Sequence, residues 1–320
     1  MVKNLFSILS QRQTSILSGA VIIMATVVAT KFLGLIRDRL LAHIFTPDSV
    51  AIFFAAFRIP DLIFQLFIFG ALSVAFIPVF TDFLEEKGEQ EAFKLAHSIL
   101  NLSLLLLLAI TILVSLFAYP ITSLIVPGFT MAQKIQVAQL TQIILIGQVV
   151  LTVGAFFIGI SQSFQRFIIP SLAGLFYNLG IILGIILFSE GFGITGAAIG
   201  VIIGATLHIL IHLPLVWSLG FRFQYVTTFF HPGVKELFKL MSVRTLGLAA
   251  EQVNVTVVVI LASLISTASV TYLTFAQHLQ VVPIGLFGAT IAQAALPVLS
   301  SERARGKMEE FKSTLLTTAH

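Results

Sequence analysis

The sequence predicts an all-α, multi-pass membrane protein whose N-terminus lies in the cytoplasm. Of its 320 residues, 58% are hydrophobic and only 10% are charged, and the mean hydropathy is +1.05. These values lie outside the range in which a water-soluble surface can be built. Apolar runs of about 20 residues or more, long enough to cross a hydrocarbon core about 30 Å thick, recur along the chain. Such runs indicate helices, because open strands leave backbone groups unpaired in lipid.

Eight of these apolar segments are predicted to span the membrane. The first runs past Ile36 with no small-residue cleavage pattern, so it is expected to be a span and not a removed signal peptide. Turn residues separate the segments, as at Thr46-Pro47-Asp48, Tyr119-Pro120 and Val126-Pro127-Gly128. The expected spans are residues 16–45, 49–81, 93–118, 134–162, 168–188, 194–219, 236–265 and 269–299.

The distribution of Lys and Arg sets the orientation of these spans, because cytoplasmic loops carry an excess of both residues. With the N-terminus inside, the outer loops hold only Lys134. The inner loops then hold Lys3, Arg12, Lys87, Lys94, Arg166, Arg222, Lys235, Lys239, Arg303, Arg305, Lys307 and Lys312. The bias predicts a cytoplasmic N-terminus.

A weak internal repeat suggests how the spans are grouped. Ala56-Phe57-Arg58 in the second span matches Ala276-Gln277-His278 in the eighth at a shift of 220 residues, as expected for a parallel six-helix repeat. We therefore expect an N-terminal six-helix lobe at 1–219, a connector at 220–235, and the first part of a second lobe at 236–320. The connector fits either an amphipathic interfacial segment or a solvated loop leading into helix seven. The repeat also predicts further spans beyond His320.

Several functional classes find no support in the sequence. With no cysteine, neither a thiolate metal site nor a cysteine nucleophile is available. Lys and Arg are scattered between apolar runs, which argues against nucleic-acid binding. His208 and His212 have helical i,i+4 spacing but no acidic residue between them and no third ligand in view, so no metal site and no enzyme are predicted. Gly180, Gly184, Gly200 and Gly204 recur at the small-xxx-small spacing of closely packed membrane helices.

Charged residues inside the spans are the strongest functional signal. A charge at membrane depth costs at least about 2.5–3.5 kcal/mol on insertion scales, so each should have a function or a partner. Eight charged residues fall inside the expected spans, and five of them are basic. They are Lys31, Arg37, Asp38, Arg39, Arg58, Asp61, Arg244 and Glu251. At 1.5 Å per residue, Arg37, Arg58 and His278 are all expected about 12 to 14 Å below the outer surface. Cationic groups from separate helices would then share one level of a central cavity.

Phosphate binding is the functional interpretation of this level. Arg37 and Arg58 offer planar forks for bidentate phosphate contact, and His278 adds a donor whose charge depends on local pH. Asp38 and Asp61 are supporting charges. The structural alternative is that Asp38 neutralises a neighbouring Arg and that Arg58 pairs with Asp61 at i,i+3. We favour the binding role for Arg37 and Arg58, while the two interpretations of His278 are evenly balanced.

Several segments together resemble one transporter family. These are Gly34-Leu35-Ile36-Arg37-Asp38, Phe57-Arg58-Ile59-Pro60-Asp61, Gly70-Ala71-Leu72-Ser73 with Ala75-Phe76-Ile77-Pro78-Val79-Phe80, Tyr177-Asn178, and Glu251-Gln252-Val253-Asn254. The pattern is similar to the MurJ (MviN) family of lipid II flippases, within the multidrug/oligosaccharidyl-lipid/polysaccharide exporter superfamily. The likeness covers nearly the whole chain, and the pattern of the first two helices is the most specific part.

The resemblance implies a flippase that moves an undecaprenyl-diphosphate-linked peptidoglycan precursor across the cytoplasmic membrane by alternating access between two six-helix lobes. It carries the family's cavity cations over to Arg37 and Arg58, with Lys31 at a position that is often basic. Gln277-His278 departs from the acidic-basic pair that is typical of the family.

The expected partners are the lipid-linked precursor and membrane lipids, with the cell-wall synthesis machinery as a further candidate. No cofactor is expected, and coupling to sodium, protons or the membrane potential stays open. The alternative functions are export of another polyprenyl-linked glycan, drug export, and a non-transporting scaffold.

Overall fold

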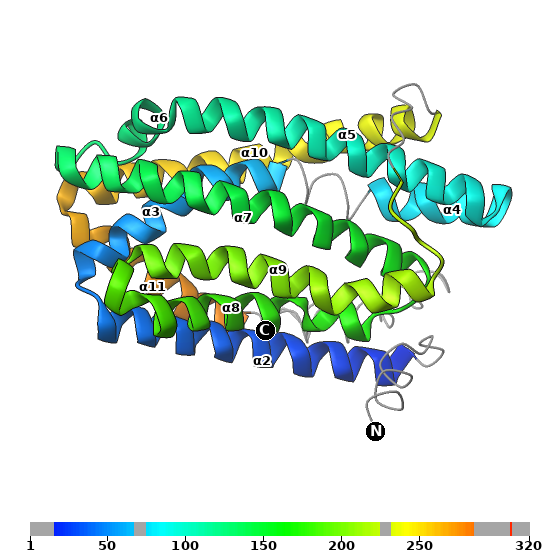
Figure 1. Cartoon of the computed structure of the whole chain (residues 1–320), viewed down its shortest axis with the longest axis horizontal. Coiled ribbons are helices and arrows are strands. Elements are labelled where there is room, and N and C mark those ends of the chain that lie inside the picture. Colours follow the sequence, from blue (N-terminus) through cyan, green and yellow to red (C-terminus); the bar gives the residue numbers. More distant parts are fainter. Residues whose placement is uncertain (1–15, 67–74, 225–231, 285–307, 309–320) are drawn as a thin grey trace. The chain divides into compact units, whose positions relative to one another are not determined.

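The computed structural model describes residues 16–66, 75–224, 232–284 and 308, and all of its regular structure within these ranges is helical. Figure 1 shows the helices: α2 (Ile16–Ile44), α3 (Pro47–Phe64), α4 (Ile77–Lys87), α5 (Glu89–Leu116), α6 (Ala118–Ile125), α7 (Met131–Ser163), α8 (Ile168–Phe192), α9 (Thr195–Ser218), α10 (Pro232–Ile265) and α11 (Thr267–Pro283). The predicted all-α class is confirmed. The chain divides into two compact units, residues 1–272 and 273–320, each described by itself.

The helices follow the predicted spans closely, with one correction. Phe117 interrupts the helical path, and a separate short helix α6 then begins at Ala118. The predicted break is therefore present but lies at Phe117, before Tyr119-Pro120, and Pro120 lies in the first turn of α6, where its missing N–H leaves no helical hydrogen bond unmade. The second span appears as α3 and α4, and residues 67–74 between them lie outside the described residues, as does the eighth span beyond residue 284.

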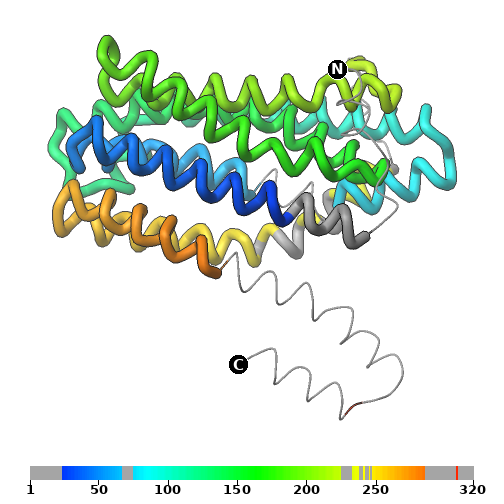
Figure 2. Tube along the Cα trace, turned by 90° about the horizontal axis from the view of Figure 1, so that it is seen from below, coloured from blue at the N-terminus to red at the C-terminus, as the bar shows by residue number. Residues whose placement is uncertain are grey.

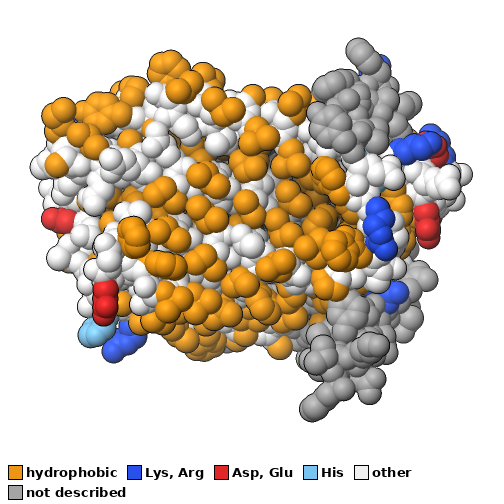
Figure 3. All heavy atoms as spheres, viewed as in Figure 1, with side chains coloured by type: hydrophobic (Ala, Val, Ile, Leu, Met, Phe, Trp, Pro, Cys, Tyr) orange, Lys and Arg blue, Asp and Glu red, His pale blue; other side chains and the backbone are white. Residues whose placement is uncertain are grey.

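Long apolar helices support membrane insertion. Among the described residues, five helical stretches are long and apolar enough to cross a membrane: Glu89–Leu116, Met131–Ser163, Ile168–Phe192, Thr195–Ser218 and Gly247–Ile265. In Figure 3, hydrophobic side chains cover the middle of the visible face, while charged groups gather at its two ends. This distribution is the one expected of a protein solvated by lipid at its centre and by water at its ends.

Local capping fixes where several helices begin. Thr46 caps α3 by accepting a hydrogen bond from the Ser49 backbone N–H, and Pro47 fits the first helical position. At the start of α7, Thr130 and Gln133 form a reciprocal capping box. Gly88, with φ at +83°, makes the tight turn between α4 and α5. These helices therefore begin where a threonine can accept a hydrogen bond from the first-turn backbone, or where glycine can adopt the φ that the turn requires.

Small residues bring the central helices into close contact. A Cβ on Gly180 would lie 2.2 Å from the Gly204 Cα, and one on Gly184 would lie 2.3 Å from the Gly200 Cα. The predicted small-xxx-small packing is thus confirmed between α8 and α9, which run side by side in both Figure 1 and Figure 2. On either side of this pair, α2 packs against α8 and α7 packs against α9, while α3 and α5 pack against α7.

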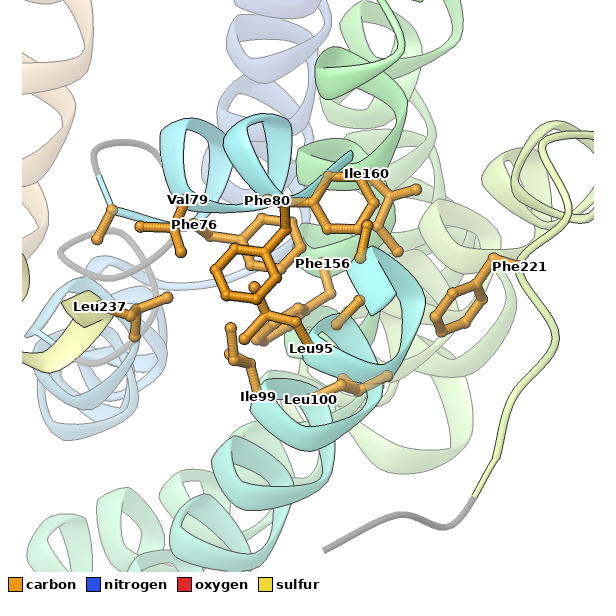
Figure 4. Close-up of a cluster of buried hydrophobic side chains, with 14 of the residues drawn as sticks. Phe76, Val79, Phe80, Leu95, Ile99, Leu100, Phe156, Ile160, Phe221 and Leu237 are labelled. Atoms are coloured by element: carbon orange, nitrogen blue, oxygen red, sulfur yellow. The ribbon is translucent and has the colours of Figure 1, made fainter. Parts of the chain in front are cut away.

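An aromatic cluster anchors the end of the protein that is predicted to face the cytoplasm. Phe76, which directly precedes α4, stacks on Phe80 of α4, and Phe156 of α7 contacts Phe76 edge-on (Figure 4). Phe221, just past α9, is buried in the same cluster and stacks on the His97 ring of α5. The cluster thereby ties the first residues after α9 to α4, α5 and α7.

The start of the connector is also held by hydrogen bonds from α5. His97 Nε2 lies 2.6 Å from the Arg222 carbonyl oxygen, and Asn101 donates to the Gln224 carbonyl at 3.0 Å. Residues 225–231 lie outside the described residues, and α10 begins at Pro232. The start of the connector, residues 221–224, is therefore non-helical and bonded to α5, while its last residues, 232–235, already belong to α10. The lobe boundaries at residues 219 and 235 stay a prediction.

Candidate functional site

Arg37 is held by partners on two helices. Its Nη2 forms an ion pair with Asp38 Oδ1 at 2.8 Å, and its Nε donates to the same oxygen at 3.0 Å. From α8, Asn178 Oδ1 accepts a hydrogen bond from Arg37 Nη1 at 3.1 Å. Asp38 is buried, so the charge of Arg37 is largely compensated by a carboxylate inside the helical bundle.

Packing between α2 and α8 places Asn178 for this contact. A Cβ on Gly174 would lie 2.7 Å from Thr30 Cγ2, so a larger residue there would require the Thr30 side chain or α2 to move away. One turn later, Asn178 donates its amide N–H to the Gly174 carbonyl at 3.0 Å. This bond fixes the amide orientation and leaves Oδ1 facing the guanidinium of Arg37.

Arg58 has a different set of contacts. Its Nη2 donates to the side-chain oxygen of Gln252 on α10, although 194 positions separate the two residues in the sequence. Its Nε is buried and has no hydrogen-bond partner among the described residues. Arg58 therefore meets a neutral acceptor where Arg37 meets a carboxylate.

Asp61 lies one helical turn after Arg58 and interacts with it electrostatically. From α7, Gln148 donates its amide N–H to Asp61 Oδ1 at 3.2 Å, and Gln148 itself is buried. Tyr177, the neighbour of Asn178, interacts electrostatically with both Asp61 and Arg37. The two arginines and their acidic neighbours thus belong to one polar region inside an apolar bundle.

Lys31 and His278 are the remaining predicted cationic residues of the site. Lys31 is half-buried on α2, and within the described part of the chain it forms neither a hydrogen bond nor an ion pair. His278 is half-buried in the unit 273–320, whereas both arginines belong to the other unit. The common level for Arg37, Arg58 and His278 therefore stays a prediction.

Amide side chains are the site residues that the sequence reasoning did not select. Asn178, Gln252 and Gln148 each contact one of the predicted charged residues. Each is a polar residue within an apolar helix, and in lipid such a side chain must find a partner on a neighbouring helix. That rule, applied to amides as well as to charges, would have found all three.

A second set of contacts lies at the end of the bundle predicted to face away from the cytoplasm. A Cβ on Gly128 would lie 2.0 Å from the Ser263 carbonyl oxygen. Two hydroxyl groups donate nearby, from Thr267 to Gln133 Oε1 at 3.2 Å and from Thr271 to the Pro47 carbonyl at 2.6 Å. We call these six residues the outer seal. They join the loop that contains Gly128 and the first turns of α3 and α7 to the end of α10 and the start of α11.

His208 and His212 form a buried pair on α9. The His212 Nδ1 lies 2.6 Å from the His208 carbonyl oxygen, and the two ring centroids are 5.0 Å apart. Among the residues that the structure describes, neither nitrogen of His208 nor Nε2 of His212 has a hydrogen-bond partner. Within the described ranges, no group of three or more His, Cys, Asp or Glu residues could hold a metal ion.

Sequence comparisons identify similar proteins. Residues 41–319 match the family model described as "Lipid II flippase MurJ". A "Probable lipid II flippase MurJ" from Buchnera aphidicola subsp. Acyrthosiphon pisum is 29% identical over 294 residues, covering 89% of this chain and 57% of that relative. The protein of the same description from Bdellovibrio bacteriovorus is 28% identical, covering 96% of this chain and 60% of that relative. The chain thus spans less than two thirds of the length of these relatives.

Two solved structures of membrane transporters have a fold similar to that of this chain. A structure titled "Lipid II flippase MurJ, inward closed conformation" matches with a TM-score of 0.74 and 25% sequence identity, covering 89% of this chain and 59% of that one. An inward-facing multidrug resistance transporter of the MATE family, in the MOP superfamily, matches with a TM-score of 0.68 and 16% identity, covering 90% of this chain and 66% of that one. The second match concerns the fold alone.

Proposed function

Because this chain belongs to the MurJ family of lipid II flippases, we propose that its protein moves a lipid-linked peptidoglycan precursor across the cytoplasmic membrane. The chain is a multi-pass membrane protein, and the proposed activity is transport by alternating access between two helical lobes. The membrane-embedded arginines Arg37 and Arg58 carry the proposal, because their guanidinium groups come from separate helices and lie in one polar region.

The diphosphate of the carrier lipid is the proposed ligand of this region. Guanidinium groups form short, charge-assisted hydrogen bonds with phosphate oxygens, and such bonds are roughly twice as strong as neutral ones. Their strength rises further where the surroundings screen charge poorly, as in a membrane protein interior. Arg58 is best prepared for this role, since its Nε donor is buried without a partner. Arg37 and Lys31 are proposed to contribute further positive charge, and a substrate-binding role for His278 is proposed from the sequence alone.

Energy coupling is part of the proposal. The protein is not expected to hold a cofactor or to carry out covalent chemistry, so the driving force would come from an ion gradient or from the membrane potential. Moving one elementary charge through 100 mV is worth about 2.3 kcal/mol, which is enough to bias a cycle that carries an anionic headgroup.

Complementation tests the assignment. The complete gene product, carrying Arg37→Ala or Arg58→Ala, is expressed in cells depleted of their own flippase, and its membrane level is measured in parallel. Both variants are expected to fail to restore growth. The matched control is Arg39→Ala, because Arg39 has the same side chain on the same helix as Arg37 but is exposed. Normal growth with Ala at position 37 or 58 would contradict the assignment.

The substrate itself needs a second experiment. Purified protein in vesicles is offered the peptidoglycan precursor or a different polyprenyl-diphosphate glycan, and the accessible fraction of each headgroup is measured. Transport of the peptidoglycan precursor alone is expected. Equal transport of both would favour a broader glycan exporter on the same fold.

A further inference from the structure

The two membrane-embedded arginines use the same edge of the guanidinium group in different ways. In Arg37, both Nε and Nη2 donate to one carboxylate oxygen of Asp38. In Arg58, Nη2 donates to the amide oxygen of Gln252, while Nε has no hydrogen-bond partner among the described residues. In Arg37 a carboxylate thus accepts from both donors of this edge. In Arg58 a neutral amide accepts from only one of the two.

Gln252 is directed at Arg58 by its place on α10. Its neighbours Glu251, Val253 and Asn254 are exposed, whereas Gln252, Val255 and Thr256 are half-buried. Residues spaced by three and four positions share one face of a helix, so Gln252 lies on the buried face of α10. The contact joins α3 of the predicted first lobe to the first helix of the predicted second lobe.

A neutral acceptor orients a guanidinium group without cancelling its charge. A phosphate oxygen carries negative charge and can accept from Nε and Nη2 together, so it forms stronger hydrogen bonds with this edge than an amide oxygen does. Asp61, the acidic group near Arg58, is tied to α7 through Gln148. The positive charge of Arg58 therefore meets its best available partner in an incoming anion.

We propose that Gln252 is a displaceable positioning residue, which holds Arg58 Nη2 in the absence of substrate and yields this donor to an oxygen of the lipid diphosphate. The inference rests on the proposed function and deepens it, because displacement would link anion binding to the release of α10 from α3. A ligand shifts a conformational equilibrium only by binding one state better than the other. Here the difference between the states is the exchange of an amide oxygen for a phosphate oxygen on Arg58.

Binding of inorganic pyrophosphate to the complete protein in nanodiscs tests this role. Gln252→Glu keeps the shape of the side chain but puts a carboxylate on Arg58, so it is expected to weaken pyrophosphate binding at least tenfold. Gln252→Ala removes the competitor, so its binding is expected to equal or exceed that of the wild type. Opposite effects at equal thermal stability distinguish displacement from a purely structural role. Weaker binding by Gln252→Ala, or unchanged binding by Gln252→Glu, would overturn the inference.

Arg58→Ala separates this inference from the proposed function. In that background the Glu substitution at position 252 is expected to have no further effect, since a double-mutant cycle isolates the pairwise interaction. Loss of pyrophosphate binding in Arg58→Ala together with a harmless Gln252→Glu would overturn the role of Gln252 alone. Pyrophosphate binding that is absent in the wild type, or unaffected by Arg58→Ala, would overturn the diphosphate site and this inference together.

Release of α10 has a direct readout, because the chain contains no native cysteine to compete with site-specific spin labels. Leu124 on α6 and Ile265 on α10 are 76% and 80% exposed, so both accept a label outside the site. Pyrophosphate is expected to lengthen the distance between the two labels in the wild type and to leave it unchanged in Arg58→Ala. An unchanged distance in a protein that binds pyrophosphate would show that α10 is not released.

Discussion

Gly128→Ala is expected to weaken the outer seal and to favour a state open on that side of the membrane. The added Cβ would lie 2.0 Å from the Ser263 carbonyl oxygen, whereas ordinary contacts begin at about 3.4 Å, so the two backbones must separate by about 1.4 Å. Overpacking of this kind costs about 1–3 kcal/mol. If the open state is free of the clash, the open-to-closed ratio rises about 5- to 150-fold.

The reaction of a single cysteine with a membrane-impermeant maleimide measures this shift. Val270 is 1% exposed and close in sequence to Thr271 of the outer seal, so Val270→Cys is expected to react slowly in the parent and faster by up to the same factor in Gly128→Ala. A cysteine at Met131, which is 70% exposed, should react equally in both backgrounds. Gly191→Ala is the matched glycine control, since a Cβ there meets nothing within 4 Å. An unchanged labelling rate at position 270 would refute the reasoning.

Three further changes probe the packing and the site. Gly184→Ala is expected to destabilise the protein by about 1–3 kcal/mol and lower its melting temperature, because α8 and α9 must separate, while Gly191→Ala on the same helix should be neutral. Asn178→Leu leaves Arg37 Nη1 without its acceptor inside the bundle, and because hydrogen bonds to charged groups are worth about 1.5–3 kcal/mol, the variant is expected to have a lower melting temperature than the wild type. His278→Arg is expected to sustain complementation and His278→Ala to reduce it; equal growth of the two variants would remove His278 from the site.

The helical framework could be predicted because membrane insertion acts on local sequence. Long apolar runs give the spans, and turn residues such as Thr46-Pro47 give their limits. Pro120 misled the prediction of where the break lies, because proline ends a helix only when it lies beyond the first turn, and here it lies inside that turn. Whether a proline ends or begins a helix depends on the residues that precede it, and Phe117 gave no recognisable signal.

The partners of the site residues could not be predicted, because they depend on how the helices pack. Arg37 and Arg58 stand out by charge alone, since charges in lipid are costly. Their amide partners Asn178 and Gln252 come from α8 and α10, and the first of these contacts depends on the close approach of Gly174 to α2. No local pattern specifies that approach, although the small residues that permit it are visible in the sequence.

The balance of charge around the arginines suits a carrier better than a tight receptor. Asp38 compensates Arg37, whereas Arg58 is held by the neutral Gln252 with Asp61 one helical turn away, so the positive charge available to an anionic headgroup is only partly cancelled. A fully uncompensated pair of arginines would cost more to hold within the membrane and would bind the diphosphate too firmly to release it. A neutral partner that the anion can displace would lower the cost of burying the arginine and would still allow release of the anion. The amide oxygen would accept from the guanidinium group when no anion is bound and would form this hydrogen bond again after the anion leaves. Under the proposed displacement, transport would depend on small differences between competing acceptors, and for that reason replacing one amide by a carboxylate is expected to block it.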